Sequence, residues 1–294
     1  MEVKGAIGVT MQGGQDFGSG KGRRDENFPV ASFFMRREHR DITRAFYNFA
    51  RAADDVADHP FTPGERKLAI LDDMRKALLG EGGDDPSAIA LRGHILERGL
   101  GFDHPLDLLQ AFCMDVTKSR YGDWDALMEY CLLSAAPVGR FVLDVHHEAR
   151  ATWPASDALC CALQVINHLQ DCGADYRNLD RVYMPLESFD AAGLGADVLA
   201  SARAPAPLRT MISGLAVRAG GLLEVGRPLV NELRDSRLAL EVAAIHRLAE
   251  SLTGMLRTRD PLSHKIHHGR ARFMGLCLAG AGRAWFGRLW PRQG

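Results

Sequence analysis

The stretch RAADDVADHP, residues 51–60, contains three aspartates within five positions: Asp54, Asp55 and Asp58. They follow an apolar and aromatic segment, and Pro60 predicts that a helix ends just after them. Carboxylates gathered in this way either lie in solvent at a helix end or hold a cation against a still more negative ligand. The choice depends on whether a second acidic segment completes the site.

Such a segment is QVINHLQDCGADYRNLDRVYMP, residues 164–185. Polar residues stand at i, i+3, i+7 and i+11 of this otherwise apolar run: Gln164, Asn167, Asp171 and Asp175. On a helix this spacing gives one face, and residues four apart lie about 6 Å apart along the axis. The last two repeat the spacing of Asp54 and Asp58. A polar row of this length must face either solvent or a functional cavity.

Two helices that each carry a carboxylate pair could hold magnesium between them. Mg²⁺ prefers octahedral oxygen ligands and commonly takes one or two carboxylates plus phosphate oxygens of a substrate. A diphosphate would complete the coordination, and the metal would neutralise it as a leaving group. An apolar interior would protect a carbocation from water. The pattern therefore favours a long isoprenoid diphosphate over a sugar or a nucleotide.

Residues typical of helix starts and ends recur along the rest of the chain. Thr62-Pro63-Gly64-Glu65 predicts a capping box whose helix runs to Gly80, and Asp85-Pro86 and His104-Pro105 begin two more helices. Further helices are expected over 123–134, 137–149, 155–174, 206–234, 236–258 and 269–290. No alternating strand pattern or repeat is evident, so residues 26–294 are expected to form one all-α domain, a large helical bundle. Residues 1–25 hold seven glycines and are expected to form a flexible leader.

Composition excludes several classes of function. The net charge of −1 gives no basic excess for nucleic acid, and 46% hydrophobic residues suit a soluble globular protein. No uncharged stretch approaches the roughly 18 residues of a membrane span, and the N-terminus lacks the apolar run of a signal peptide. The six cysteines form no CxxC pair and read as buried hydrophobes. A cytoplasmic protein is expected.

Three segments resemble the squalene/phytoene synthase family: YNFARAADDVAD (47–58), MEYCLLSAAPVG (128–139) and residues 164–185. The resemblance covers about residues 26–290. It implies a helical bundle of the class I isoprenoid synthase type with a central cavity, and Mg²⁺ as the cofactor.

Carried over residue by residue, the resemblance assigns roles to named side chains. The metal ligands would be Asp54, Asp58, Asn167, Asp171 and Asp175. Arg51 and Arg181 would contact the diphosphate. Residues lining the reacting part of the cavity would be Tyr47, Tyr130, Gln164 and Tyr183. Further substrate contacts would come from Asn27, Val138, Gly139 and Asn167.

Within the family, three details are similar to the bacterial branch that serves hopanoid synthesis: GSGKGRRDENFPVAS, SAAPVGR (134–140) and INHLQDCGADYRNLDRVYMP. That branch ionises presqualene diphosphate, rearranges the cyclopropylcarbinyl cation and lets water capture it as hydroxysqualene, without nicotinamide. The alternative is head-to-head condensation of two farnesyl diphosphates to presqualene diphosphate or another C30 product. A third reading, a non-catalytic assembly factor, is disfavoured because all four key aspartates are present.

Two other regions suggest contacts beyond the substrate. The run RFMGLCLAGAGRAWFGRLWPR near the C-terminus is apolar with interspersed arginines, which predicts either core packing or a peripheral contact at the inner face of the membrane. The resemblance also implies functional coupling to other enzymes of squalene synthesis. The histidines of His146-His147-Glu148 and of the stretch DPLSHKIHHGR (260–270) are expected to lie at the surface rather than to bind metal.

Overall fold

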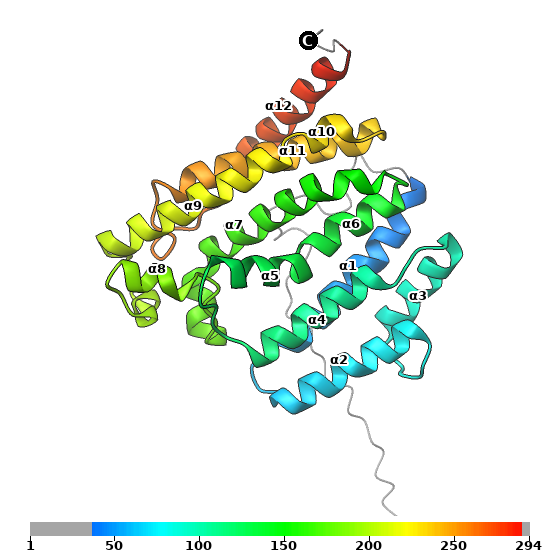
Figure 1. Cartoon of the computed structure of the whole chain (residues 1–294), viewed down its shortest axis with the longest axis horizontal. Helices are drawn as coiled ribbons and strands as arrows, with labels where there is room; N and C mark the ends of the chain where they lie inside the picture. The colour runs from blue at the N-terminus through cyan, green and yellow to red at the C-terminus, as the bar shows by residue number, and fades with distance from the viewer. Residues whose placement is uncertain (1–36, 290–294) are drawn as a thin grey trace, which may run out of the picture.

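The computed structural model describes residues 37–289, and the regular elements of this part of the chain are helices (Figure 1). The long helices of its first half are α1 (Arg37–Asp58), α2 (Gly64–Leu79), α3 (Pro86–Arg98), α4 (Asp103–Thr117), α5 (Trp124–Ser134) and α6 (Ala136–Val145). Those of its second half are α7 (Trp153–Leu179), α9 (Ala206–Gly226), α11 (Ser236–Leu256) and α12 (Arg270–Leu289). Short helices complete the described part: η1 (Arg150–Thr152), α8 (Leu186–Ala191), η2 (Ala196–Ala200) and α10 (Leu229–Glu232).

The predicted all-α class is confirmed. Among the described residues the extended pairing is one isolated bridge, between Arg120 and Val182. The predicted leader, residues 1–25, and the substrate residue Asn27 lie outside the described residues. The domain boundary at residue 26 therefore stays a prediction.

Local signals account for several helix ends. Asp85 caps α3, because its Oδ1 accepts a hydrogen bond from Ala88 N at 2.8 Å. Gly80 and Gly99 end α2 and α3 in the left-handed conformation that glycine adopts without strain. α1 ends at Asp58, two residues before Pro60, as its sequence predicts.

Two predicted details are wrong. The Thr62 side chain does not cap α2: its hydroxyl pairs with His59 Nδ1 at 2.7 Å, and extended Pro63 is the residue that precedes the helix. The predicted helix over 206–234 is broken after Gly226, because Pro228 supplies no amide hydrogen and restricts the residue before it.

One helix is longer than predicted, with a consequence for function. We expected a helix over 155–174, but α7 extends from Trp153 to Leu179. Its additional turn contains Asp175, so Asp171 and Asp175 both lie on regular helix. The i, i+4 geometry deduced from their spacing therefore holds.

The helices pack around two groups of buried apolar side chains. One group joins α1 to α2, α3 and α4 and includes Phe141 and Val145 of α6. The other surrounds α7 and is shared with α5, α9 and α11. In Figure 1 the helices are stacked in the order α11, α9, α7, α4 and α2 from the upper to the lower part of the molecule. The two groups adjoin through α6, which packs on α7 and on α1, the helices that carry the acidic segments.

One stretch, Trp124–Val145, has the length and apolar composition of a membrane span. In the structure it forms two helices, α5 and α6, which meet at Ala135. Tyr130 on this stretch is buried in the protein and hydrogen-bonded to Asp115. The stretch therefore behaves as part of the protein core.

Candidate active site

The two acidic segments meet across one cavity of about 330 Å³. This volume lies at the small end of ligand pockets, which occupy about 300–1,000 Å³. From α1 its walls include Tyr47, Ala50, Arg51, Asp54 and Asp58, and from α7 they include Gln164, Asn167, His168, Asp171 and Asp175. The remaining lining residues are Phe112, Asp115, Tyr130, Ser134, Leu179, Arg181 and Tyr183.

The α1 wall is an ion-paired acidic surface. Arg51 Nη1 donates to Asp54 at 2.7 Å and its Nη2 donates to Asp55 at 2.9 Å, as expected for residues three and four apart on a helix. Burial raises the pKa of Asp54 to about 7, with Asp58 adding to the effect and Arg51 opposing it. One arginine therefore does not neutralise this wall, and a further cation would be favoured there.

The α7 wall presents the polar row predicted from the sequence. Gln164, Asn167 and Asp175 are half-buried, and Asp171, one turn before Asp175, is exposed. The apolar positions between them, including Val165 and Ile166, pack into the core behind the wall. All four residues of the row line the cavity, and Asp171 is also open to solvent.

Asp115 at the end of α4 joins the cavity wall, although its sequence context gave it no role. Its Oδ2 accepts a hydrogen bond from Tyr130 and its Oδ1 accepts one from Tyr183, both at 2.8 Å. Burial raises the pKa of Asp115 to about 6, while Arg181 and the two tyrosine hydroxyls act in the opposite direction. Because both hydroxyls donate to Asp115, each is held in a fixed orientation beside the cavity.

Arg181 connects three parts of the site while it is itself buried. Its guanidinium Nε donates to the backbone oxygen of Asp115 at 3.1 Å and its Nη2 donates to that of Ala57 at 3.0 Å. Its Nη1 forms an ion pair with Asp58. The planar fork of arginine thereby links α1 to α4 and fixes one predicted metal ligand.

The backbone after α7 explains how Arg181 reaches this position. Asp180 adopts a left-handed conformation with φ of 50°, which turns the chain sharply at the end of the helix. Val182 N then donates to Ser119 O at 2.9 Å, so this segment lies beside the chain that follows α4. The segment RVYMP is thus held against the base of the cavity.

Aromatic rings line the inner end of the cavity. The His168 ring stacks on Tyr183 with 3.7 Å between centroids, and the Tyr130 ring lies 5.4 Å from that of Tyr183. Burial lowers the pKa of His168 to about 3, with Arg181 contributing, so the imidazole is neutral at physiological pH. The inner end therefore offers aromatic faces rather than a protonated histidine.

The model of the squalene/phytoene synthase family matches residues 22–272, which is most of the chain. This chain belongs to the squalene/phytoene synthase family. The match spans both acidic segments and every described residue that lines the cavity. The membership predicted from the sequence is confirmed.

Individual members of the squalene/phytoene synthase family are similar over nearly the whole chain. A hydroxysqualene synthase from Rhodopseudomonas palustris is 52% identical over 87% of this chain and 88% of its own length. A hydroxysqualene synthase from Zymomonas mobilis is 52% identical over 90% of both chains. The crystal structure of a squalene synthase from Alicyclobacillus acidocaldarius superposes with a TM-score of 0.70 at 32% identity, covering 80% of this chain and 89% of that one.

This family relationship gives context to the residues that the sequence singled out. Eleven of them line the cavity: Tyr47, Arg51, Asp54, Asp58, Tyr130, Gln164, Asn167, Asp171, Asp175, Arg181 and Tyr183. Two others do not. Val138 is 41% exposed, and a side chain at Gly139 would collide with Ser156 and Cys160. The role of Val138 and Gly139 in substrate binding therefore rests on the sequence pattern alone.

Sequence reasoning missed the other lining residues, which are Ala50, Phe112, Asp115, Ser134, His168 and Leu179. The sequence signal for His168 was its place directly after Asn167 of the polar row. In the structure His168 is buried and lines the cavity. For Asp115 the signal was an acid in the otherwise apolar run AFCMDV of α4. Its tyrosine partners lie 15 and 68 residues away, so no local pattern identifies them.

We expect Asp115→Asn to lower turnover by about tenfold or more and to destabilise the protein by about 1.5–3 kcal/mol, because a hydrogen bond to a charged group is worth about that much. The amide oxygen can accept from only one of Tyr130 and Tyr183. The amide nitrogen must donate to the other hydroxyl, which then has to turn its own hydrogen away. Steady-state kinetics and thermal melts test this. Asp125→Asn on the exposed side of α5 is the matched control. Unchanged turnover in the Asp115 variant would contradict a positioning role.

Proposed function

We propose that this chain is a hydroxysqualene synthase, an Mg²⁺-dependent carbon–oxygen lyase that converts presqualene diphosphate to hydroxysqualene. The observation that carries the proposal is 52% identity to two proteins of that name over about nine-tenths of each chain. The cavity supports it, since a prenyl diphosphate needs a polar mouth for the diphosphate and an apolar, aromatic interior for the chain.

The side chains of the cavity fit Mg²⁺. Asp54, Asp58, Asp171 and Asp175 supply carboxylate oxygens from two helices, and Asn167 adds an amide oxygen. Hard oxygen donors without sulfur or imidazole are the set that magnesium prefers. Burial is the largest cause of the raised pKa of Asp54, and the nearby carboxylates of Asp58, Asp115 and Asp55 add to it, so a cation at this wall would be favoured. When bound, Mg²⁺ supplies positive charge that stabilises the departing diphosphate.

Cationic side chains of the protein orient the diphosphate. Arg51 lies on α1 beside Asp54, with 22% of its side chain exposed, so its guanidinium is within reach of a ligand at the mouth. Arg181 is buried and holds Asp58 in place. We therefore assign diphosphate contact chiefly to Arg51, and to Arg181 the task of keeping the acidic wall in position.

The reaction consumes one water. The carbon–oxygen bond of presqualene diphosphate breaks, and its electron pair leaves with the diphosphate. The cyclopropylcarbinyl cation rearranges, and water then forms the new carbon–oxygen bond and loses a proton. The rings of Tyr183, Tyr130 and His168 suit the cationic stage, because aromatic faces attract a cation without trapping it covalently. Neutral His168 adds no opposing charge.

Incubation with separate substrates tests the proposal. Purified protein with Mg²⁺ is given either presqualene diphosphate or farnesyl diphosphate, and the extracted lipids are identified by mass spectrometry. We expect hydroxysqualene from presqualene diphosphate, no turnover of farnesyl diphosphate, and loss of the product when Mg²⁺ is chelated. Consumption of farnesyl diphosphate would instead assign the chain to the condensing branch. Turnover of neither would favour a non-catalytic role.

We also propose a peripheral contact between α12 and a lipid surface. Four large apolar residues of this helix are exposed: Met274 (58%), Leu278 (63%), Trp285 (52%) and Phe286 (73%). Met274, Leu278 and Trp285 recur at i, i+4 and i+11, which is one helical face. Another face of α12 packs on α11, and the far end of α12 projects beyond the other helices (Figure 1).

We expect the Met274→Ser/Leu278→Ser variant to lose most of its binding to anionic phospholipid vesicles, because it removes the apolar part of that face. Flotation of the full chain with vesicles measures the bound fraction. The matched control is Val217→Ser/Val225→Ser on α9, which changes two residues that are 53% and 60% exposed. Equal flotation of both variants would contradict docking through α12.

A further inference from the structure

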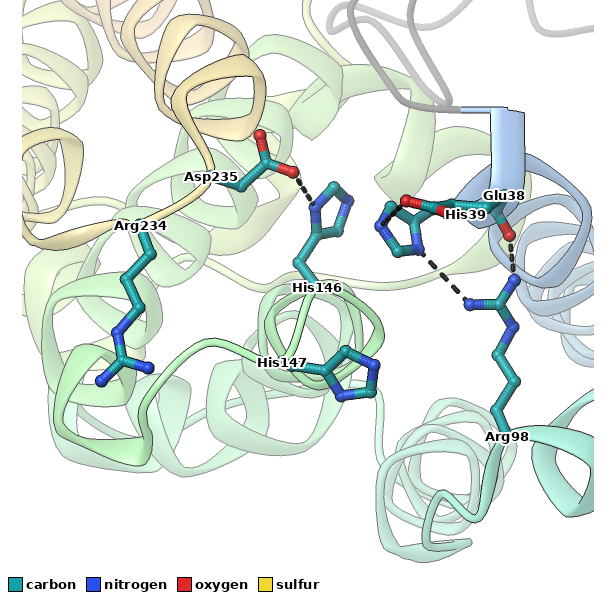
Figure 2. Close-up of a pocket in the computed structure, with 7 residues that line it drawn as sticks. All are labelled: Glu38, His39, Arg98, His146, His147, Arg234 and Asp235. Atoms are coloured by element: carbon teal, nitrogen blue, oxygen red, sulfur yellow. Dashed lines mark hydrogen bonds and ion pairs between the residues drawn. The ribbon is translucent and has the colours of Figure 1, made fainter.

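Two histidines and an aspartate from three helices meet away from the active-site cavity. They are His39 near the start of α1, His146 at the end of α6 and Asp235 at the start of α11 (Figure 2). The expectation that His146 lies at the surface is wrong, because its side chain is only 1% exposed. His147 beside it is exposed, as are His264 and His267, in agreement with that expectation.

The three side chains are close enough to share one ion. One potential ligand atom from each lies within 4.8 Å of the other two. His146 Nδ1 is 3.0 Å from Asp235 Oδ2, and the His39 and His146 rings are 4.1 Å apart at their centroids. Tetrahedral zinc bonds of about 2.0–2.1 Å place ligand atoms roughly 3.3 Å apart. Shifts of about an ångström would therefore close a site around a metal.

Surrounding contacts hold Asp235 in place. Asp235 caps α11, where its Oδ1 accepts from Arg237 N at 2.8 Å, and its Oδ2 remains directed at His146. Glu148 accepts from the backbone nitrogens of Arg234 and Asp235 at 2.9 and 2.7 Å, which fixes the loop before α11. Rigid support of this kind is what orients metal ligands in proteins.

The charge state of the site suits a metal. Burial lowers the pKa of His39 to about 4, and the nearby His146 acts in the same direction, so His39 is neutral at physiological pH. Burial alone would raise the pKa of Asp235, but the amide hydrogen of Arg237 and the imidazole of His146 lower it below its usual value. A neutral imidazole and an ionised carboxylate are the forms that bind divalent metals.

We propose that His39, His146 and Asp235 form a binding site for a divalent transition metal of the Zn²⁺ class, distinct from the magnesium site. Imidazole nitrogens with one carboxylate favour zinc over magnesium or calcium. A fourth ligand would be water or the carboxylate of Glu38, whose Oε1 lies 3.5 Å from His39 Nε2. The metal would tie the start of α1 to α6 and α11, and thus join the two apolar groups of the fold.

The positive charge of Arg98 disfavours a metal at this site, so a substitution of Arg98 tests the proposal. Its guanidinium Nη1 lies 3.4 Å from His39 Nδ1, and its Nη2 donates to the backbone oxygen of Glu38 (Figure 2). A metal on Nε2 leaves a proton on Nδ1, which then faces a guanidinium that also donates. Binding must therefore displace Arg98, and its positive charge weakens the site. Removing that charge should tighten binding.

The experiment measures Zn²⁺ binding by the full chain in saturating Mg²⁺, so that the aspartate-lined cavity does not compete for zinc. Equilibrium dialysis with metal analysis gives stoichiometry and Kd, and thermal melts give the stabilisation. We expect one equivalent of Zn²⁺ and a rise in Tm of about 5 °C at a concentration a hundredfold above Kd. Co²⁺ in place of Zn²⁺ should give visible absorption bands of a tetrahedral site.

Variants identify the ligands. His39→Ala and His146→Ala should each weaken Zn²⁺ binding by about 100-fold, whereas Arg98→Gln should tighten it by about tenfold. His264→Ala/His267→Ala, which removes two exposed histidines, is the matched control and should bind like the native chain. The His39→Ala protein should keep its Mg²⁺-dependent activity and unfold cooperatively without zinc, which shows that it is folded.

Three results would overturn the proposal. The first is no saturable Zn²⁺ binding by the native chain. The second is binding that survives both single histidine variants, which would place the ion elsewhere. The third is an Arg98→Gln protein that binds Zn²⁺ no more tightly than the native chain. None of these depends on turnover, so failure here is distinguishable from failure of the proposed lyase activity.

Discussion

Asp171→Asn is expected to lower turnover of presqualene diphosphate by on the order of 10³-fold while the protein remains folded. Asp171 is an exposed residue of the polar row on α7, where an amide of the same size fits without repacking. The substitution removes one negative charge from the proposed Mg²⁺ site. Because the side chain is exposed, the free energy of unfolding should change by less than about 0.5 kcal/mol.

Steady-state kinetics across a range of Mg²⁺ concentrations measure this effect. A raised Mg²⁺ requirement in the variant would indicate weakened metal binding, and partial recovery at high Mg²⁺ would agree with it. Asp190→Asn on α8 is the matched control, because Asp190 is exposed and does not line the cavity. Ordinary turnover by the Asp171→Asn protein would remove the metal assignment of this cavity.

Arg181→Met is expected to destabilise the protein by about 3 kcal/mol or more, because removing one partner of a buried ion pair leaves its charge uncompensated. Arg181 is 6% exposed and pairs with Asp58 while bonding to the backbone of α1 and α4. The variant would leave Asp58 and Asp115 facing each other without that cation. Turnover should fall as well, because Asp58 is a proposed metal ligand.

Urea unfolding followed by circular dichroism measures the loss of stability. Arg181→Lys should recover part of it, since an ammonium keeps the charge but cannot make all three directed contacts. Arg177→Met is the matched control: it removes an exposed arginine on the last turn of α7, with a single 3.4 Å contact to Leu199 O. A loss below about 1 kcal/mol for Arg181→Met would show that the buried arginine is not a structural link.

The local features of this protein were predictable from its sequence. The positions of Asp54 and Asp58, and of Asp171 and Asp175, predict two acidic helical faces because the period of the α-helix is set by local backbone geometry. Asp85 before Pro86 predicts a helix start for the same reason. Where prediction failed locally, as at Thr62, a competing side chain took the hydroxyl: His59 is its partner.

Contacts between helices were not predictable in this way. Asp115 receives hydrogen bonds from Tyr130 on α5 and from Tyr183 after α7, and no spacing along the chain relates these residues. Likewise His39 and Asp235 are 196 positions apart and meet only because α1 and α11 both pack near the end of α6.

The sequence by itself determined the helical class, the family and the spacing of the acidic residues, because helix periodicity and motif chemistry act over a few residues. The tertiary structure alone decided that Arg181 is buried behind Asp58 and that His146 is enclosed rather than exposed. It also decided that one face of α12 stays uncovered. Burial of this kind depends on which helices pack together, and that follows from the shape and volume of the whole core.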